Sequence, residues 1–269
     1  MHSTAVTTEL EHVRCAAIAL CAFAFVAATP EPVLAASCSF EPQGEGRVAA
    51  VIDARTFRLQ DGREIRLAGI ETIMPGRAAT NAAPALSAIV AGRDVTLTGE
   101  DDTPDRYGRQ PAFAFLDGSD TAVQAVLLAQ GEALVSGNVT GKDCAAALLA
   151  AEAEARRAKR GIWADPSAIK NAESPGDILA GIGRFTVVEG RVLSVRQAGA
   201  TTYLNFGRNW TRDFAVTISR RMIGAVEASG MSLKSLESRR IRVRGWVEAR
   251  GGPRIEVVRP GQIELAGGN

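Results

Sequence analysis

A strand–turn–strand pattern within residues 50–76 constrains this chain most. Apolar and polar residues alternate through Phe57-Arg58-Leu59 and again through Glu64-Ile65-Arg66-Leu67. Asp61-Gly62 lies between the two runs and is a hairpin signal, because both residues tolerate the positive φ of a tight turn. We therefore predict two paired strands around which the domain is organised. Five polar residues lie on or just beyond these strands, where we expect any chemistry to start: Asp53, Arg55, Arg66, Glu71 and Thr72.

Length and charge divide the chain into two regions. The 269 residues suit one large domain or two ordinary ones, and 46% apolar with 23% charged residues is typical of a globular protein. The net charge of +1 hides a split, since residues 37–183 carry 15 Lys and Arg against 20 Asp and Glu, whereas residues 184–269 carry 15 against 7. This asymmetry predicts an acidic partner for the second region. The candidates are nucleic acid, anionic lipid or lipopolysaccharide phosphate, a peptidoglycan-associated polyanion, and the first region itself.

The first 36 residues have the pattern of a secretory signal peptide. Arg14 precedes an uncharged apolar run over residues 15–28, and the small residues of Val33-Leu34-Ala35-Ala36 suit a peptidase. The run is too short to predict a transmembrane helix, so we expect no transmembrane segment in the mature chain. We expect an exported protein, periplasmic or secreted. Lipoprotein anchoring at Cys38 is the less favoured alternative, because Leu34 lies one place too early for a lipobox.

Cleavage of this segment would leave two cysteines, Cys38 and Cys144, and no histidine. Two cysteines in an exported protein predict one disulfide, with two unrelated buried thiols as the alternative. The absence of histidine excludes a Ser-His-Asp or Cys-His nucleophile and a His-ligated zinc site from the mature chain. Catalysis would then depend on carboxylates, arginines, lysines or tyrosines, with an oxygen-ligated hard metal as an option.

The order of elements predicts a mainly β protein with packed helices, of the α+β class. In the first region, strands are expected over 47–59, 63–70, 94–98 and 111–116, with helices over 78–91, 121–130 and 143–160. Residues 166–183 are rich in Pro, Ser, Asn and Gly and are expected to be a linker. Beyond them, five short β-type runs with a helix over 221–229 between the third and fourth have the element order of an OB-fold.

Aromatic residues in the second region lie among cations. Tyr203, Phe206 and Trp210 stand beside Arg208 and Arg212, as on surfaces that bind single-stranded nucleic acid. The alternative is that Tyr203 and Phe206 are core residues of a strand and the two arginines are solvated.

Residues 46–165 resemble the staphylococcal nuclease (thermonuclease) family. The resemblance depends on five short motifs in order: Val51-Ile-Asp-Ala-Arg-Thr56, Ile65-Arg-Leu-Ala-Gly-Ile-Glu-Thr72, Asp105-Arg-Tyr-Gly-Arg109, Ala151-Glu-Ala-Glu-Ala-Arg156 and Gly161-Ile-Trp163. It implies an OB-type barrel with packed helices that hydrolyses phosphodiester bonds in DNA and RNA with one calcium ion. Residues 184–269 resemble the smaller OB-like β-barrel modules that follow such domains, through Tyr203-Leu-Asn-Phe-Gly207, Asp213-Phe214 and Arg242-Val-Arg-Gly245.

Matched position by position, the resemblance gives each site residue a role. Arg66 and Arg109 fall on the family's phosphate-holding catalytic arginines, and Glu71, with Arg66 and Arg109, completes the catalytic set. Asp53, Glu71 and Thr72 fall on positions that bind the metal. Two positions depart from the family: Arg55 stands where a metal-binding aspartate is expected, and Met74 stands where the family has its proposed general base, a glutamate.

These departures predict a weakened centre. Calcium takes 6–8 oxygen ligands, and a guanidinium at one ligand position removes a carboxylate and adds a positive charge. Methionine accepts no proton, and general-base assistance contributes a factor of about 10²–10⁴. Arg55, Arg66 and Arg109 still offer planar donor groups suited to phosphate. We expect Asp53 or Glu71 to pair with Arg55.

Three functions follow from this sequence. The first is an exported protein that binds nucleic acid or another polyanion and hydrolyses it weakly or not at all, with calcium binding reduced. The second is an active metal-dependent phosphodiesterase that uses Asp53, Glu71 and a carboxylate from elsewhere, such as the 99–105 loop. The third is an envelope interaction module without enzymatic activity.

Overall fold

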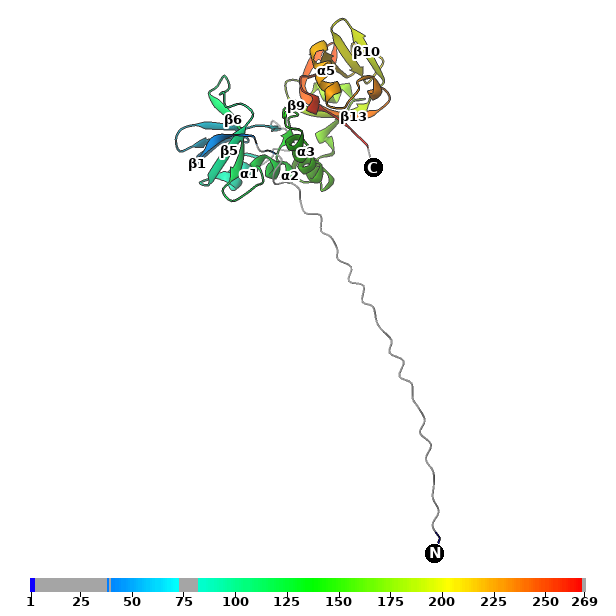
Figure 1. Cartoon of the computed structure of the whole chain (residues 1–269). Coiled ribbons are helices and arrows are strands. Elements are labelled where there is room, and N and C mark those ends of the chain that lie inside the picture. Colours follow the sequence, from blue (N-terminus) through cyan, green and yellow to red (C-terminus); the bar gives the residue numbers. More distant parts are fainter. Residues whose placement is uncertain (3–37, 39, 73–81, 268–269) are drawn as a thin grey trace. The chain divides into compact units, whose positions relative to one another are not determined.

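The computed structural model describes residues 1–2, 38, 40–72 and 82–267, and all the elements named below belong to one compact unit, Val33–Asn269 (Figure 1). The predicted signal peptide and Met74 lie outside the described residues, apart from residues 1–2. Of the helices in the described part of the chain, none is long and apolar enough to cross a membrane.

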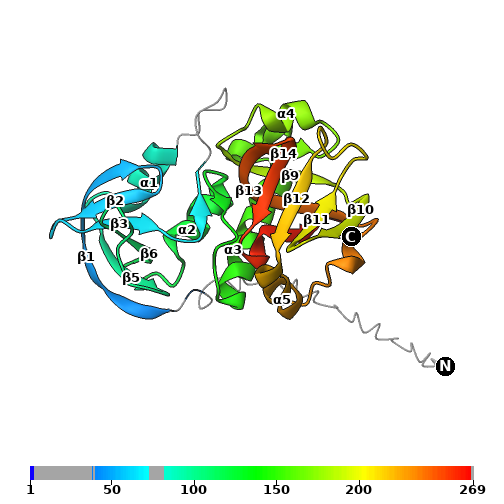
Figure 2. The ribbon, with the colours of Figure 1, turned by 90° about the horizontal axis from the view of Figure 1, so that it is seen from above.

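Five strands of the first region close into a barrel. In barrel order they are β1 (Glu41–Asp53), β2 (Thr56–Leu59), β3 (Glu64–Leu67), β6 (Arg109–Leu116) and β5 (Asp94–Gly99). The predicted hairpin is confirmed, because β2 and β3 pair antiparallel with Phe57 opposite Ile65, and Gly62 has a φ of +91° in the turn. The closing pair, β3 with β6, is parallel. Figure 2 shows these strands curling around a common centre.

Apolar side chains that alternate along these strands fill the barrel. Phe57, Ile65 and Leu67 are completely buried, together with residues from three helices, α1 (Ala82–Val90), α2 (Val123–Gln130) and α3 (Lys142–Arg157). A short antiparallel pair, β4 (Ile70–Glu71) with β7 (Leu134–Val135), extends the chain beyond β3. Gly69 connects β3 to β4 at a φ of +76°, where a Cβ would lie 2.9 Å from Val139 Cγ2, so glycine fits this bend on two counts.

The predicted disulfide is confirmed. Cys38 and Cys144 are bonded, with their Cα atoms 4.5 Å apart, and both are buried. The bond ties the segment before β1 to the first turn of α3.

The second region is a single eight-stranded sheet. The strand order is β10 (Ser194–Ala198), β11 (Thr201–Asn205), β12 (Ala215–Ser219), β14 (Gly252–Val257), β13 (Arg240–Arg250), β9 (Phe185–Arg191) and β8 (Ile169–Asn171), with β15 (Ile263–Leu265) paired to β13. A helix, α5 (Arg220–Ala228), follows β12. A second β-rich region is therefore present, as expected. The first of the five predicted β-type runs, expected over residues 185–195, is divided between two strands, β9 and β10. The OB-like barrel over 184–269 stays a prediction.

The prediction of a linker over residues 166–183 is wrong. Ile169–Asn171 forms β8, which pairs parallel with β9, and Pro175–Leu179 forms α4. Ala172 and Ile178 are buried in the core of the second region. The turn-forming residues mark the bends between these short elements, while Ala172 and Ile178 among them face the core.

The two regions share a hydrophobic cluster. It combines Leu134, Ala155, Ile162 and Trp163 from the first region with Phe185 and Val187 from β9. Gly137 and Gly261 meet without side chains between them, since a Cβ on Gly137 would lie 2.8 Å from the Gly261 backbone. The regions are thus parts of one packed body rather than separate domains on a tether.

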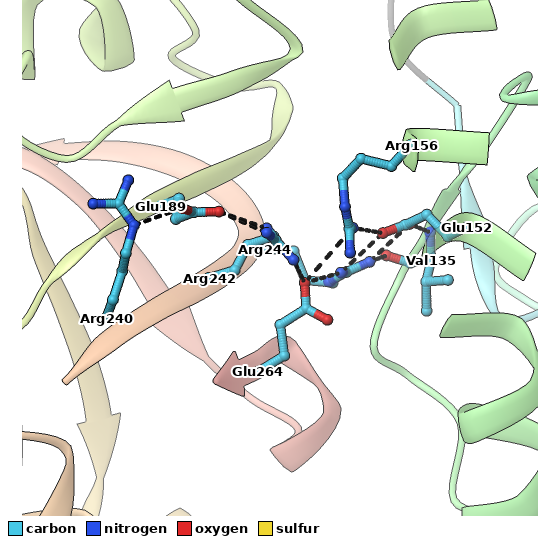
Figure 3. Close-up of polar contacts among 8 residues, drawn as sticks. All are labelled: Val135, Glu152, Arg156, Glu189, Arg240, Arg242, Arg244 and Glu264. Carbon is cyan, nitrogen blue, oxygen red and sulfur yellow. Dashed lines mark hydrogen bonds and ion pairs between the residues drawn. The ribbon is translucent and has the colours of Figure 1, made fainter. Parts of the chain in front are cut away.

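A buried ion network crosses the same contact (Figure 3). Arg244 on β13 is fully buried and makes a bidentate pair with fully buried Glu152 on α3, with Nη1–Oε2 at 2.9 Å and Nη2–Oε1 at 3.0 Å. Its Nη1 also donates to the Val135 carbonyl at 3.0 Å, while the Val135 N–H donates to Glu152. Glu264 accepts from both Arg244 and Arg242. Part of the positive charge of the second region is therefore neutralised by the first region.

Candidate functional site

The residues expected to form a site come together at one side of the barrel. Asp53 ends β1, Arg55 lies in the turn before β2, Arg66 is on β3, and Arg109 begins β6. Arg66 is opposite Pro111 in the parallel β3–β6 pair. Residues two apart on a strand face the same side, so Arg109 is a diagonal neighbour of Arg66. Ile65 and Leu67 point into the core, which leaves Arg66 on the outer face.

Arg55 is tied to the protein by both terminal nitrogens. Its Nη2 is 2.6 Å from Glu71 Oε2, and its Nη1 donates to the Ile70 carbonyl at 2.8 Å. The side chains of Arg55 and Glu71 are only 13% and 15% exposed. Asp53 instead accepts the backbone N–H of Arg55 at 2.9 Å, as in an Asx-turn. Of the two carboxylates expected to pair with Arg55, the structure selects Glu71.

Arg66 lies in a strongly charged setting. Burial lowers the pKa of Arg66 most, the positive charges of Arg55 and Arg109 lower it further, and Glu71 and Asp53 oppose the shift. Within the described ranges, Arg66 forms no ion pair. Three guanidinium groups thus share this side of the barrel with the carboxylates of Asp53 and Glu71, and Arg66 keeps its donors available for an anion.

Arg109 is held in place by its own loop. Its Nε and Nη2 donate to Asp105 Oδ2 at 2.9 and 2.6 Å, and its backbone N–H donates to Asp105 Oδ1 at 3.1 Å. The side-chain hydrogen bond from Arg109 is the main reason that the pKa of Asp105 falls to about 2. The Arg106 and Arg109 guanidinium carbons lie 4.8 and 4.9 Å from the ring centroid of Tyr107, which is 65% exposed.

The supporting residues Asp105 and Tyr107 are additions to the predicted site. The sequence motif predicts a role for Arg109 but none for Asp105 or Tyr107. The signal that could have found them is the spacing of Asp105 and Arg109, which places the carboxylate on the guanidinium across a tight turn containing Gly108 at a φ of +77°.

The described residues do not fit a resident calcium ion. Glu71 is engaged by Arg55, and an Asp53 oxygen accepts a backbone N–H. Thr72 is half-buried beyond Glu71. Over residues 38, 40–72 and 82–267, no three His, Cys, Asp or Glu side chains gather closely enough to hold a metal, whereas calcium takes 6–8 oxygens, several of them anionic. The arrangement suits an anion better than a cation.

The first region is thus a closed five-stranded barrel that carries Arg66 and Arg109 on neighbouring strands, beside the Arg55–Glu71 ion pair. Residues 64–165 match the family model of the staphylococcal nuclease homologues, so the chain contains a domain of this kind. The strands β1 and β2 precede the matched residues but complete the same barrel. No family is identified for the β-rich region that follows. A comparison with curated proteins finds no match for the chain.

Proposed function

We propose that this chain is an exported thermonuclease-like protein that binds phosphodiester polymers, nucleic acid foremost, through Arg66 and Arg109, with a weak or inactive hydrolytic centre. The observation that carries the proposal is the Arg55–Glu71 ion pair, which stands where the resemblance places the metal. The predicted leader and the Cys38–Cys144 disulfide support export.

The ion pair opposes a divalent cation in two ways. Glu71 must leave Arg55 before it can ligate, and both groups are largely buried, so the charge left behind would be poorly solvated. The Arg55 guanidinium would also lie within a few ångströms of the cation, where repulsion costs several kcal/mol even at an effective dielectric constant of about 20. Asp53 alone does not offset these costs.

The positions of Arg66 and Arg109 support the phosphate binding that we propose. Arg66 and Arg109 are neighbours on one face of the sheet, and Asp105 fixes the orientation of Arg109. Planar guanidinium groups match phosphate oxygens in geometry and charge. Arg55 was also predicted to contact phosphate. Its terminal nitrogens already donate to Glu71 and Ile70, and a phosphate contact therefore stays a prediction.

The test combines binding and cleavage of labelled DNA by the purified protein. We expect binding in the presence of a chelator, an affinity that falls steeply as salt rises, and little cleavage with calcium. Arg66→Gln and Arg109→Gln should each weaken binding. Arg58→Gln is the matched control, because Arg58 lies on the neighbouring strand, is half exposed and pairs with Glu64.

Two results would contradict the proposal. Rapid calcium-dependent cleavage that Arg66→Gln and Glu71→Gln both abolish would instead support an active phosphodiesterase. Failure to bind any polyanion at low salt would support an envelope module without this function.

A further inference from the structure

We propose that the second region carries its own binding site for single-stranded nucleic acid, in a groove on the open face of its sheet. The groove, here called the Tyr203 groove, is formed by Arg196, Tyr203, Arg208, Trp210, Glu237 and Arg254 with small residues between them. Its volume is about 750 Å³, within the range of roughly 300–1,000 Å³ typical of ligand sites. It belongs to a different sheet from Arg66 and Arg109 and is independent of the function proposed for them.

Strand register places the groove on the outer face of the sheet. Arg196 on β10 is opposite Tyr203 on β11, and Tyr203 is opposite Thr217 on β12. The alternate residues, such as Leu204 and Val216, are buried in the core. Because strand side chains alternate between faces, the polar and aromatic residues are collected on the side that the core leaves open.

The groove offers aromatic surface for a base. Trp210 lines the groove and is 76% exposed, so much of its indole surface is open to stacking with a planar base. The guanidinium carbon of Arg254 lies over the ring of Tyr203, 5.6 Å from the ring centroid. Phe206, which the sequence analysis grouped with these residues, is instead a core residue packed against Phe214.

Charge selects an anionic ligand. Among the groove residues named above, three are arginines and one is a glutamate. In the described part of the chain, Arg196, Arg208 and Arg254 form no ion pair, unlike Arg242 and Arg244 of the same region. The Arg254 Nη2 donates to the Arg250 carbonyl at 3.2 Å, and the guanidinium lies over the ring of Tyr203 at the edge of the groove.

The combination favours a single strand over a duplex. Stacking on Trp210 needs an unpaired base face, and phosphates of the same strand can reach the groove arginines. A duplex hides its base faces and would use only the arginines. A neutral glycan would use the tryptophan but leave three cations without partners.

The experiment measures binding of a labelled short oligothymidylate to the purified protein by fluorescence anisotropy. Trp210→Ala should lower the affinity about 5- to 100-fold. Arg196→Gln should reduce the slope of log affinity against log salt by about 0.7. The matched controls, Trp246→Ala and Arg221→Gln, remove an exposed tryptophan and an exposed arginine outside the groove and should leave affinity unchanged.

Each outcome decides the inference. Wild-type affinity in both Trp210→Ala and Arg196→Gln would overturn it, as would equal affinity of the Arg66→Gln/Arg109→Gln variant for the single strand and for a duplex of the same length. Loss of oligothymidylate binding in Arg66→Gln but not in Trp210→Ala would overturn it while supporting the proposed function. Loss in Trp210→Ala with binding retained in Arg66→Gln would establish the Tyr203 groove by itself.

Discussion

Replacing Arg244 with methionine should destabilise the protein by about 3–5 kcal/mol. Arg244 and Glu152 are both fully buried and are joined by two hydrogen bonds of 2.9 and 3.0 Å. Without Arg244, Glu152 would keep only the Val135 N–H and Arg156, whose Nη1 is 3.4 Å away. A buried carboxylate stripped of its main partner is the costly case, whereas Glu264 is partly exposed and still pairs with Arg242.

Urea denaturation followed by Trp fluorescence gives the magnitude. With a slope of about 2–3 kcal/mol per molar urea for a chain of this size, the midpoint should fall by roughly 1–2 M. The double variant Arg244→Met/Glu152→Gln should recover much of the loss, because glutamine keeps an acceptor for the Val135 N–H and removes the unpaired charge.

Arg240 is the matched control on the same strand. It pairs with Glu189 at 2.7 Å but is 61% exposed, so Arg240→Met should cost at most about 1 kcal/mol. A loss below about 1 kcal/mol for Arg244→Met, or equal losses for Arg240→Met and Arg244→Met, would refute the argument from burial.

Two further predictions concern the first region. The pKa of Asp105 is about 2 in the folded protein against an ordinary value of 3.8, and a lowered carboxyl pKa stabilises the fold above the ordinary value. The stability difference between wild type and Asp105→Asn, from urea melts across pH, should therefore be constant above about pH 4 and shrink as pH falls towards about 2. The Cys38→Ser/Cys144→Ser variant should lose about 2–5 kcal/mol, since the bond joins residues 106 apart in sequence. An unchanged thermal midpoint would contradict this.

Local signals predicted the hairpin and the pairing of Arg55. Apolar and polar residues alternate around Phe57 and Ile65, and Gly62 forms the turn between them. All these signals lie within about ten residues, where the two-residue period of a strand and the turn residues decide the local structure. A guanidinium between two carboxylates must pair with one of them if it is partly buried, and only the structure shows that Glu71 is the one.

Contacts between residues far apart in the chain could not be predicted from local sequence patterns. Arg244 meets Glu152 at a distance of 92 residues along the chain, and a single Arg between Val243 and Gly245 carries no local sign that it is buried. The strand β8 is only three residues long and lies between residues that favour turns. Its pairing with β9 therefore depends on packing against the core and not on the strand propensity of its residues. Asp105 and Tyr107 likewise support Arg109 through side-chain contacts that spacing alone only suggests.

We propose that the nuclease-like site keeps two arginines that bind phosphate, while Arg55 and Met74 replace a metal ligand and a general base. The direct measurement is DNA cleavage against calcium concentration for the wild type and for Arg55→Asp/Met74→Glu. We expect little calcium-dependent cleavage by the wild type and a clear gain in the double variant, abolished again by adding Arg66→Gln. Strong calcium-dependent cleavage by the wild type, with no gain in the double variant, would contradict it.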